Sequence, residues 1–94
     1  MTYKLKFLPA ALKEWEKLAP NIKAQFKKKL AERLENPHIP SARLRGYEAV
    51  YKIKLRTLGY RLAYEVIDEE IVVYILAIGK RDKDEVYKKL AARK

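Results

Sequence analysis

Every second residue between positions 51 and 56 is cationic, and this pattern marks the part of the chain best suited to chemistry. The cations are Lys52, Lys54 and Arg56, the residues between them are apolar, and Arg61 follows in a second alternating segment. A period of two residues is typical of a β-strand whose two faces differ. One face is then apolar, and the other carries cations that can hold a phosphate backbone and stabilise negative charge developing on it.

A short turn between the two alternating segments would bring their cations together. A connection of two or four residues sets Lys54 opposite Arg61 and Lys52 opposite Ala63, and directly opposed residues share a face of the sheet. Like charges this close are mildly destabilising unless an anion binds to them. Two plainer interpretations stay open: a solvated outer face of a sheet, and an anion-binding face without catalysis.

RNA cleavage suits such a cluster because the ribose 2′-hydroxyl is a built-in nucleophile. The protein must supply a base, stabilise the charged phosphorane and help the leaving oxygen. His38 is the only histidine, and we interpret it as a loop residue, so if the chain is a ribonuclease either a lysine acts as the base or none of the usual groups does. Neighbouring cations lower the pKa of a lysine, which makes both Lys52 and Lys54 candidates. Arginine stays protonated and can bind the phosphate in a fork.

The composition limits the class of protein. The 94 residues suit one domain, residues 1–94, and 22 Lys plus Arg against 12 Asp plus Glu favour a polyanionic partner, either nucleic acid or an acidic protein. The absence of cysteine excludes disulfides, a thiolate zinc site and a cysteine nucleophile. No Asp, Glu and His set has metal-ligand spacing, so we expect neither metal nor cofactor. The longest apolar run, residues 71–78, is too short to span a membrane, and the N-terminus has no apolar signal core. We therefore expect a cytoplasmic protein without membrane contacts.

Hydrophobic periodicity predicts the N-terminal elements that support this cluster. A short strand is predicted over residues 3–7. Helices are predicted to begin at Pro9 and Pro20, because proline is favoured in the first turn. Their apolar stripes are Leu8, Leu12 (or Ala11), Trp15 and Leu18 in the first helix, and Ile22, Phe26, Leu30 and Leu34 in the second. Two prolines within residues 36–41 must end the second helix.

The second half of the chain reads as strands followed by a helix. Strands are predicted over residues 47–56, 60–67 and 71–78, and their short connections imply antiparallel neighbours. The last of them is apolar on both faces, which indicates a central strand. A final helix over residues 83–92 has Asp82 as its N-cap and only Val86 and Leu90 as apolar anchors, so it should be weakly held.

The element order β-α-α-β-β-β-α predicts the fold class. It indicates an α+β domain in which a helical hairpin packs on one face of an antiparallel sheet and a short helix follows at the C-terminus.

Taken together, these segments resemble the RelE family of bacterial and archaeal toxins, from toxin–antitoxin operons, within the RelE/ParE superfamily. The resemblance covers nearly the whole chain in the same element order and implies a RelE-like, microbial-RNase-like fold. It is carried by ALKEW at 11–15, LRG at 44–46, YKIKLR at 51–56, GYRL at 59–62, GKR at 79–81 and EVY at 85–87.

This resemblance implies an endoribonuclease that enters the ribosomal A site, contacts ribosomal RNA and cuts mRNA, leaving a 2′,3′-cyclic phosphate and a 5′-hydroxyl. It implies a RelB-like antitoxin as partner, an acidic and partly disordered protein that wraps the toxin and can displace its last helix. Toxin and antitoxin together would repress their own operon, so operator DNA is a partner only through the antitoxin complex.

The resemblance also implies roles for individual residues. Lys52 and Lys54 fit the two strand lysines, one of them a candidate base, and Arg61 fits the arginine that stabilises the transition state. Arg81 fits the arginine assigned to the leaving group, and Tyr87 fits the aromatic that stacks on an mRNA base. Further candidates for contacts with RNA or the ribosome are Arg45, Arg56, Lys80 and Lys83.

Two points from the residues themselves qualify these roles. Strict alternation through the last strand places Lys80, rather than Arg81, on the face shared with Arg61, so Arg81 would reach the site only if Gly79 breaks the pleat. Tyr87 has a plainer interpretation as a packing residue of the last helix.

Two other functions stay open. A ParE-like protein has a similar fold and inhibits DNA gyrase by binding, and an inactive relative would serve only as antitoxin partner and corepressor. The set Lys52, Lys54, Arg61, Arg81 and Tyr87 favours the nuclease, because a binding inhibitor has no need of it.

Overall fold

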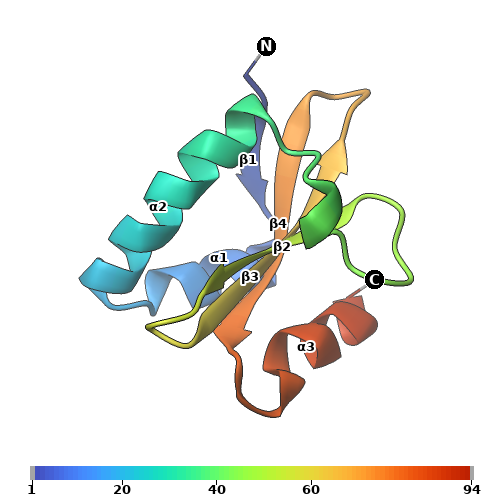
Figure 1. The fold of residues 1–94 in the computed structure, drawn as a ribbon. Helices are drawn as coiled ribbons and strands as arrows, with labels where there is room; N and C mark the ends of the chain where they lie inside the picture. The colour runs from blue at the N-terminus through green and yellow to red at the C-terminus, as the bar shows by residue number, and fades with distance from the viewer. Residues whose placement is uncertain (1, 94) are drawn as a thin grey trace.

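The computed structural model describes residues 2–93, apart from the side chain of Lys83. Within these residues one four-stranded sheet has the order β1-β4-β3-β2 (Figure 1). Its strands are β1 (Lys4–Phe7), β2 (Val50–Leu55), β3 (Tyr60–Ile67) and β4 (Val72–Lys80). The helices are α1 (Pro9–Glu16), α2 (Pro20–Glu35) and α3 (Glu85–Arg93).

The predicted α+β class and element order are confirmed, and β4 is an inner strand as its apolar faces indicated. One detail differs from the prediction. The sheet is mixed rather than wholly antiparallel, because β1 pairs in parallel with β4, from Lys4 opposite Val72 to Phe7 opposite Ile75. The connection from β1 to β4 includes both N-terminal helices, so no short turn constrains these two strands to be antiparallel.

Helices α1 and α2 cover one face of the sheet. Both begin with proline in the first turn, as predicted, and their buried residues include Ala11 and Phe26. Of the two alternatives for the α1 stripe, Ala11 faces the core, whereas Leu12 is 41% exposed. With alternate residues of the strands, such as Tyr51 and Ile53, these helices form the larger hydrophobic core.

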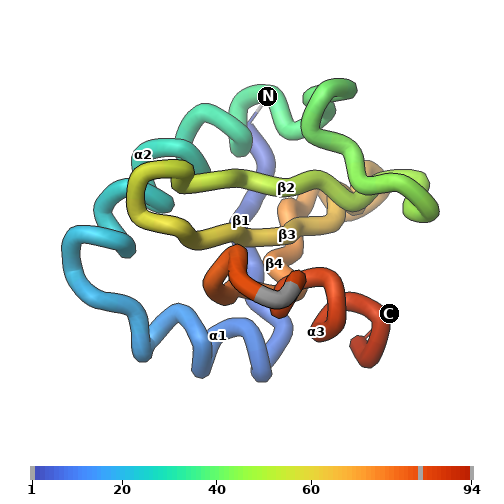
Figure 2. The backbone as a smooth tube through the Cα atoms, turned by 60° about the horizontal axis from the view of Figure 1, so that its bottom comes forward, coloured from blue at the N-terminus to red at the C-terminus, as the bar shows by residue number. Residues whose placement is uncertain are grey.

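Helix α3 packs on the opposite face. Val86 and Leu90 are buried in a second apolar cluster with strand residues such as Val50, Ala63 and Leu76. Both views place the strands between α2 and α3 (Figures 1 and 2). The face that carries the cations of β2 is therefore partly covered by α3.

A β-bulge in β4 changes which of its residues face this side. Ala63 pairs with Ala77 and Tyr64 with Ile75, so Leu76 is an extra residue in β4. Leu76 and Ala77 both lie in the second cluster, whereas Ile75 belongs to the larger core. Beyond the bulge the alternation of the strand is therefore inverted.

The inverted alternation overturns the prediction for Lys80 and Arg81. Gly79 pairs with Arg61 and Lys80 pairs with Tyr60, so Lys80 lies on the face away from Arg61. Arg81 follows Gly79 by two residues and comes to the Arg61 side without a broken pleat. Glycine suits position 79 for a different reason: a Cβ there would lie 3.1 Å from the side chain of Glu85, which is a tight contact.

Other boundaries differ at the ends of elements. The strand predicted from residue 47 begins at Val50, after a turn in which Gly46 has a φ of +89°. The predicted N-cap at Asp82 is wrong, because residues 82–84 form a 3₁₀ turn and α3 begins at Glu85. Over the described residues, no helix is long and apolar enough to cross a membrane.

Candidate active site

Strands β2 and β3 bring three of the predicted site residues together. The register sets Lys54 opposite Arg61 and Lys52 opposite Ala63, as predicted, with Leu55 opposite Tyr60 at the turn. Ala63 is fully buried, so the space that this small residue leaves is filled by the second apolar cluster beneath α3. The cations lie beside the helix rather than on an open sheet.

The surroundings of Lys54 favour its neutral form. The positive charge of Lys52 lowers the pKa of Lys54 most, and partial burial, Arg61 and Arg56 lower it further. Each of these effects disfavours another positive charge at this position. Lys54 therefore holds a larger fraction of neutral amine at neutral pH than an isolated lysine, which is the form a general base needs.

Arg81 reaches this group because it directly follows β4, two residues beyond Gly79. Its backbone N–H donates to the carbonyl oxygen of Gly59 at 2.9 Å, which fixes it beside the turn between β2 and β3. A cleft of about 260 Å³ is lined by Lys54, Leu55, Arg56, Tyr60, Arg61 and Arg81. One amine and three guanidinium groups thus converge on a single cleft.

Arg61 is held between β3 and the start of α3. Its guanidinium lies over the ring of Tyr87, 5.3 Å from the ring centroid. Its Nη1 lies 3.8 Å from Oδ1 of Asp84, a carboxylate that is itself 72% exposed. Both contacts orient Arg61. The pairing with the exposed Asp84 shows that the guanidinium can bind an anion that approaches from the solvent.

Tyr87 has two environments at once. It packs against the second apolar cluster, as its plainer interpretation predicted, and it contacts Arg61. It also lines an open cleft of about 440 Å³ together with Arg43, Leu44, Arg45, Tyr47, Lys52 and Leu90. An aromatic ring beside three cations in an open cleft can stack on a base whose phosphate the cations hold.

The further RNA-binding candidates are not all in one place. Arg45 lines the Tyr87 cleft, and Arg56 lines the cleft with Arg81. Lys80 is exposed and lies on the other face of the sheet, so the structure does not bring it to the cluster. The side chain of Lys83 lies outside the part that the structure describes.

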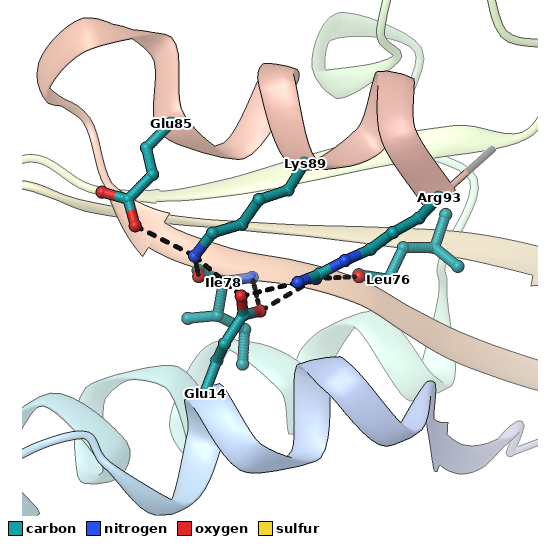
Figure 3. Close-up of polar contacts among 6 residues, drawn as sticks. All are labelled: Glu14, Leu76, Ile78, Glu85, Lys89 and Arg93. Carbon is teal, nitrogen blue, oxygen red and sulfur yellow. Dashed lines mark hydrogen bonds and ion pairs between the residues drawn. The ribbon is translucent and has the colours of Figure 1, made fainter.

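Helix α3 is attached by a charged network that the sequence analysis missed (Figure 3). Glu14 of α1 accepts two bonds from Arg93, at 3.0 and 2.9 Å, and forms a 2.7 Å ion pair with Lys89. Arg93 also donates to the carbonyl oxygen of Leu76, and Lys89 to that of Ile78. The predicted apolar anchors are therefore joined by a polar attachment to α1 and β4.

Within the described residues, the network occupies an edge of β4 that no strand covers. Strand β1 ends at Phe7, opposite Ile75, so the next β4 residues have no strand partner on that side. Glu14 accepts a bond from the backbone N–H of Ile78 at 3.1 Å, and the cations of α3 take the neighbouring carbonyl groups. Burial raises the pKa of Glu14, but bonds from Arg93, Lys89 and this amide outweigh it and lower the pKa below its usual value. A lone glutamate in a helical pattern gave no signal of this role.

His38 lies in a loop, as predicted, and both of its ring nitrogens have hydrogen-bond partners. Its Nε2 is 2.9 Å from Asp68 and its Nδ1 is 3.1 Å from the hydroxyl of Tyr51. Hydrogen bonds from Tyr3 and His38 lower the pKa of Asp68. This group joins the loop to the β3–β4 turn, and neither His38 nor Asp68 lines the clefts of Arg81 and Tyr87. In the described part of the chain, no cluster of three or more His, Asp or Glu side chains is arranged to hold a metal ion.

Comparison with known proteins identifies the family. The family model described as the ParE toxin of type II toxin–antitoxin system, parDE, matches residues 5–85. The mRNA interferase toxin RelE of Escherichia coli strain K12 is 52% identical over 93 residues, which are 99% of this chain and 98% of that protein. This chain belongs to the RelE family. Another relative, a putative RelE-like toxin protein of Escherichia coli, is 54% identical over 87 residues, 93% of this chain and 92% of its own.

Solved RelE structures have the same fold. A mutant of the Escherichia coli toxin RelE in the free state matches with a TM-score of 0.90 and 50% identity, over 99% of this chain and 98% of that chain. A chain of the intact Escherichia coli RelBE toxin–antitoxin complex matches with a TM-score of 0.83 and 52% identity, over 86% and 99% of the two chains. The expected RelE-like fold is thereby confirmed.

Proposed function

We propose that this RelE-family chain is a ribosome-dependent endoribonuclease that cuts mRNA in the ribosomal A site and thereby stops translation. The convergence of Lys54, Arg61 and Arg81 on one cleft carries the proposal. Relatives that are 52% identical over nearly the whole chain are named mRNA interferases, which supports the same activity here. A cognate RelB-like antitoxin neutralises the protein, since the RelE of Escherichia coli has been solved in complexes with RelB.

The reaction uses the ribose of the message as its nucleophile. Lys54 in its neutral form takes the proton of the 2′-hydroxyl, and the resulting oxygen attacks the adjacent phosphorus. Lys52 is the alternative base and a phosphate contact. Arg61 binds the phosphate oxygens and stabilises the charge that builds up on the phosphorane. The bond to the 5′-oxygen then breaks, which leaves a 2′,3′-cyclic phosphate and a 5′-hydroxyl.

Arg81 and Tyr87 serve the leaving group and the base. Arginine keeps its proton at all accessible pH values, so Arg81 stabilises negative charge on the departing 5′-oxygen, and water completes the proton transfer. Tyr87 stacks on a base of the message from its position beside Arg61. Arg45 and Arg56, which line the neighbouring clefts, hold the flanking phosphates or ribosomal RNA.

Dependence on the ribosome follows because this site alone does not hold the RNA in a reactive geometry. A lysine base is a slow catalyst because much of it stays protonated at neutral pH. The clefts are also open, so they do not by themselves force the 2′-oxygen into line with the leaving group. The A site supplies that geometry by holding the codon, which can lower the barrier by several kcal/mol. This function places the protein in the cytoplasm, where it meets ribosomes.

A second candidate function rests on the family model, which is described as ParE toxin. A ParE-like protein would arrest growth by binding DNA gyrase and would leave messages intact. An inactive relative would repress its operon with the antitoxin and would cause no arrest.

A translation-coupled cleavage assay tests the proposal. Ribosomes paused on a defined message are mixed with purified protein, and primer extension locates any cut. We expect cuts within the A-site codon only when ribosomes are present, and a loss of at least ~100-fold in rate for Arg81→Ala, Arg61→Ala or Lys54→Ala. Lys13→Ala, an exposed lysine of α1, removes the same charge and should cut normally. Full activity in Arg81→Ala refutes its role, and growth arrest with DNA breaks and intact message supports the gyrase candidate.

A further inference from the structure

A second cleft lies beside Lys54, on the side of α2. It measures about 560 Å³ and separates α2 from the end of β2 and the following turn. Helix α2 contributes Asn21, Gln25 and Lys29, and the strand and turn contribute Lys54, Leu55, Arg56, Thr57 and Leu58. We refer to it as the α2 cleft. None of the three helix residues was a candidate in the sequence analysis.

The outer backbone edge of β2 leads toward this cleft. Arg33 of α2 donates to the carbonyl oxygen of Lys52 at 3.1 Å, and the N–H of Leu44 donates to that of Val50 at 2.8 Å. Both carbonyl groups therefore point away from β3, toward the outer edge of the sheet. Because backbone groups alternate along a strand, those of Lys54 point to the same edge, where the α2 cleft begins.

Two of the clefts share residues of β2, and the Tyr87 cleft lies beside the preceding cation of the same strand. Lys52 lines the Tyr87 cleft, whereas Lys54 and Arg56 line both the Arg81 cleft and the α2 cleft. From Lys52 to Arg56 the strand advances about 13 Å, at ~3.3 Å per residue. A single strand of RNA that places one base at Tyr87 and its phosphate at Lys54 is thus directed toward the α2 cleft.

We propose that the α2 cleft binds the nucleotide of the message that flanks the cleaved bond on the side away from Tyr87. This inference rests on the proposed nuclease function. Lys29 and Arg56 supply positive charge for a phosphate, and the side-chain amides of Asn21 and Gln25 can hydrogen-bond a base edge or ribose. Leu55 and Leu58 give the base an apolar surface. An acidic protein segment could pair with the cations and the amides, but RNA also presents a flat base for the apolar surface of Leu55 and Leu58.

Binding of short RNA to the intact protein tests the proposal. The RNA carries a fluorophore, and a 2′-deoxy ribose at the cleaved position keeps it whole, so anisotropy reports affinity alone. We expect Lys29→Gln and Gln25→Ala each to weaken binding about threefold to tenfold, as for loss of one hydrogen bond. Lys28→Gln is the matched control, because Lys28 is the adjacent exposed lysine of α2 and lines none of these clefts.

Shortening the RNA one nucleotide at a time locates the contact. If the cleft holds the flanking nucleotide, its removal weakens binding to wild-type protein and no longer matters in Lys29→Gln, so the two losses are not additive. Additive losses, or equal binding by wild type and Lys29→Gln, overturn the proposal. So does a loss for Lys29→Gln that appears only on ribosomes, which would assign the cleft to ribosomal RNA. Failure of the proposed function is distinguishable, because wild-type protein would then leave ribosome-bound message uncut whatever its affinity for RNA.

Discussion

Lys54 lies between Lys52 on its own strand and Arg61 on the facing strand, and this placement determines its acid–base behaviour. The neighbouring charge of Lys52 is the main cause of its lowered pKa. If the chain cuts RNA as proposed, crowding by cations provides a lysine base in place of the histidine that many nucleases use. The crowding that costs stability in the free protein is relieved when a phosphate arrives.

The first prediction follows from that origin of the pKa. If Lys54 is the base, the cleavage rate rises with pH until the lowered pKa is reached. Lys52→Gln removes the main cause of the shift, so the pKa of Lys54 rises, less neutral amine is present at pH 7 and the rise moves to higher pH. Single-turnover rates on ribosomes from pH 6 to 9 measure this. A profile that loses its pH dependence altogether in Lys52→Gln identifies Lys52 as the base instead.

Asp84 provides a second prediction at the residue scale, because its carboxylate pairs with the guanidinium of Arg61, the group that we propose binds the phosphate. The pair is long, 3.8 Å, and exposed. Surface pairs of this kind contribute about 0.2–1 kcal/mol, so Asp84→Asn should strengthen RNA binding by up to about fivefold. Asn tolerates the φ of 52° at this position, which keeps the turn intact. Asp82→Asn is the control, and an equal gain there would indicate a general charge effect rather than release of Arg61.

At the scale of elements, the sequence predicted those features that depend on local pattern. The stripes of α1 and α2 indicated two helices on one face, and the alternation through residues 51–56 indicated the strand and its register with β3. The short turn left few registers to choose from, so the pairing of Lys54 with Arg61 was accessible from sequence.

Features that depend on contacts between distant elements could not be predicted from the sequence. The extra residue at Leu76 inverts the phase of β4, and no turn residue or proline marks it. Both Leu76 and Ala77 are apolar and buried, so each fits either face in the sequence pattern. For the same reason the exchange of faces between Lys80 and Arg81 could not be predicted. The α2 cleft depends on how α2 lies along β2, which periodicity alone does not determine.

Helix α3 gives the prediction at this scale. Glu14→Gln removes the carboxylate that Arg93 and Lys89 share and leaves Lys89 paired with Glu85 alone, and the loss of such charge-assisted bonds should lower the free energy of unfolding by about 1–3 kcal/mol. Thermal and urea unfolding measure it. The control is Glu16→Gln, which changes an exposed glutamate of α1, the helix that carries Glu14, and should change stability little. Cleavage should fall in Glu14→Gln as well, because α3 carries Tyr87.

The pH dependence of this difference has a definite sign. The folded-state pKa of Glu14 lies below its usual value of 4.5, so the folded chain binds fewer protons there than the unfolded chain. The stabilisation is therefore complete above about pH 4.5 and disappears as the pH falls through the lower folded-state pKa. The stability curves of wild type and Glu14→Gln should converge in acid. A difference that stays constant below pH 4 would show that packing, rather than charge, is lost.

For the whole molecule, the arrangement of charge matters more than its total. The net charge of +10 attracts any polyanion, but the cations of α3 that contact Glu14 are already paired, whereas those of β2 line open clefts. RNA should therefore lie along the row of cations on β2 instead of binding anywhere on the positive surface.

The salt dependence of RNA binding distinguishes these two cases. A single strand lying from the Tyr87 cleft to the α2 cleft would have about three or four phosphates neutralised, which gives a slope of about −2 to −3 for log affinity against log salt. Anisotropy between 50 and 300 mM salt, with the RNA that cannot be cut, measures the slope. Lys52→Gln should reduce it by about 0.7, the contribution of one phosphate of a single strand. Lys28→Gln should not change it, because Lys28 lies away from the clefts. Equal reductions in the two variants would mean that RNA responds to the overall charge and follows no defined path across the protein.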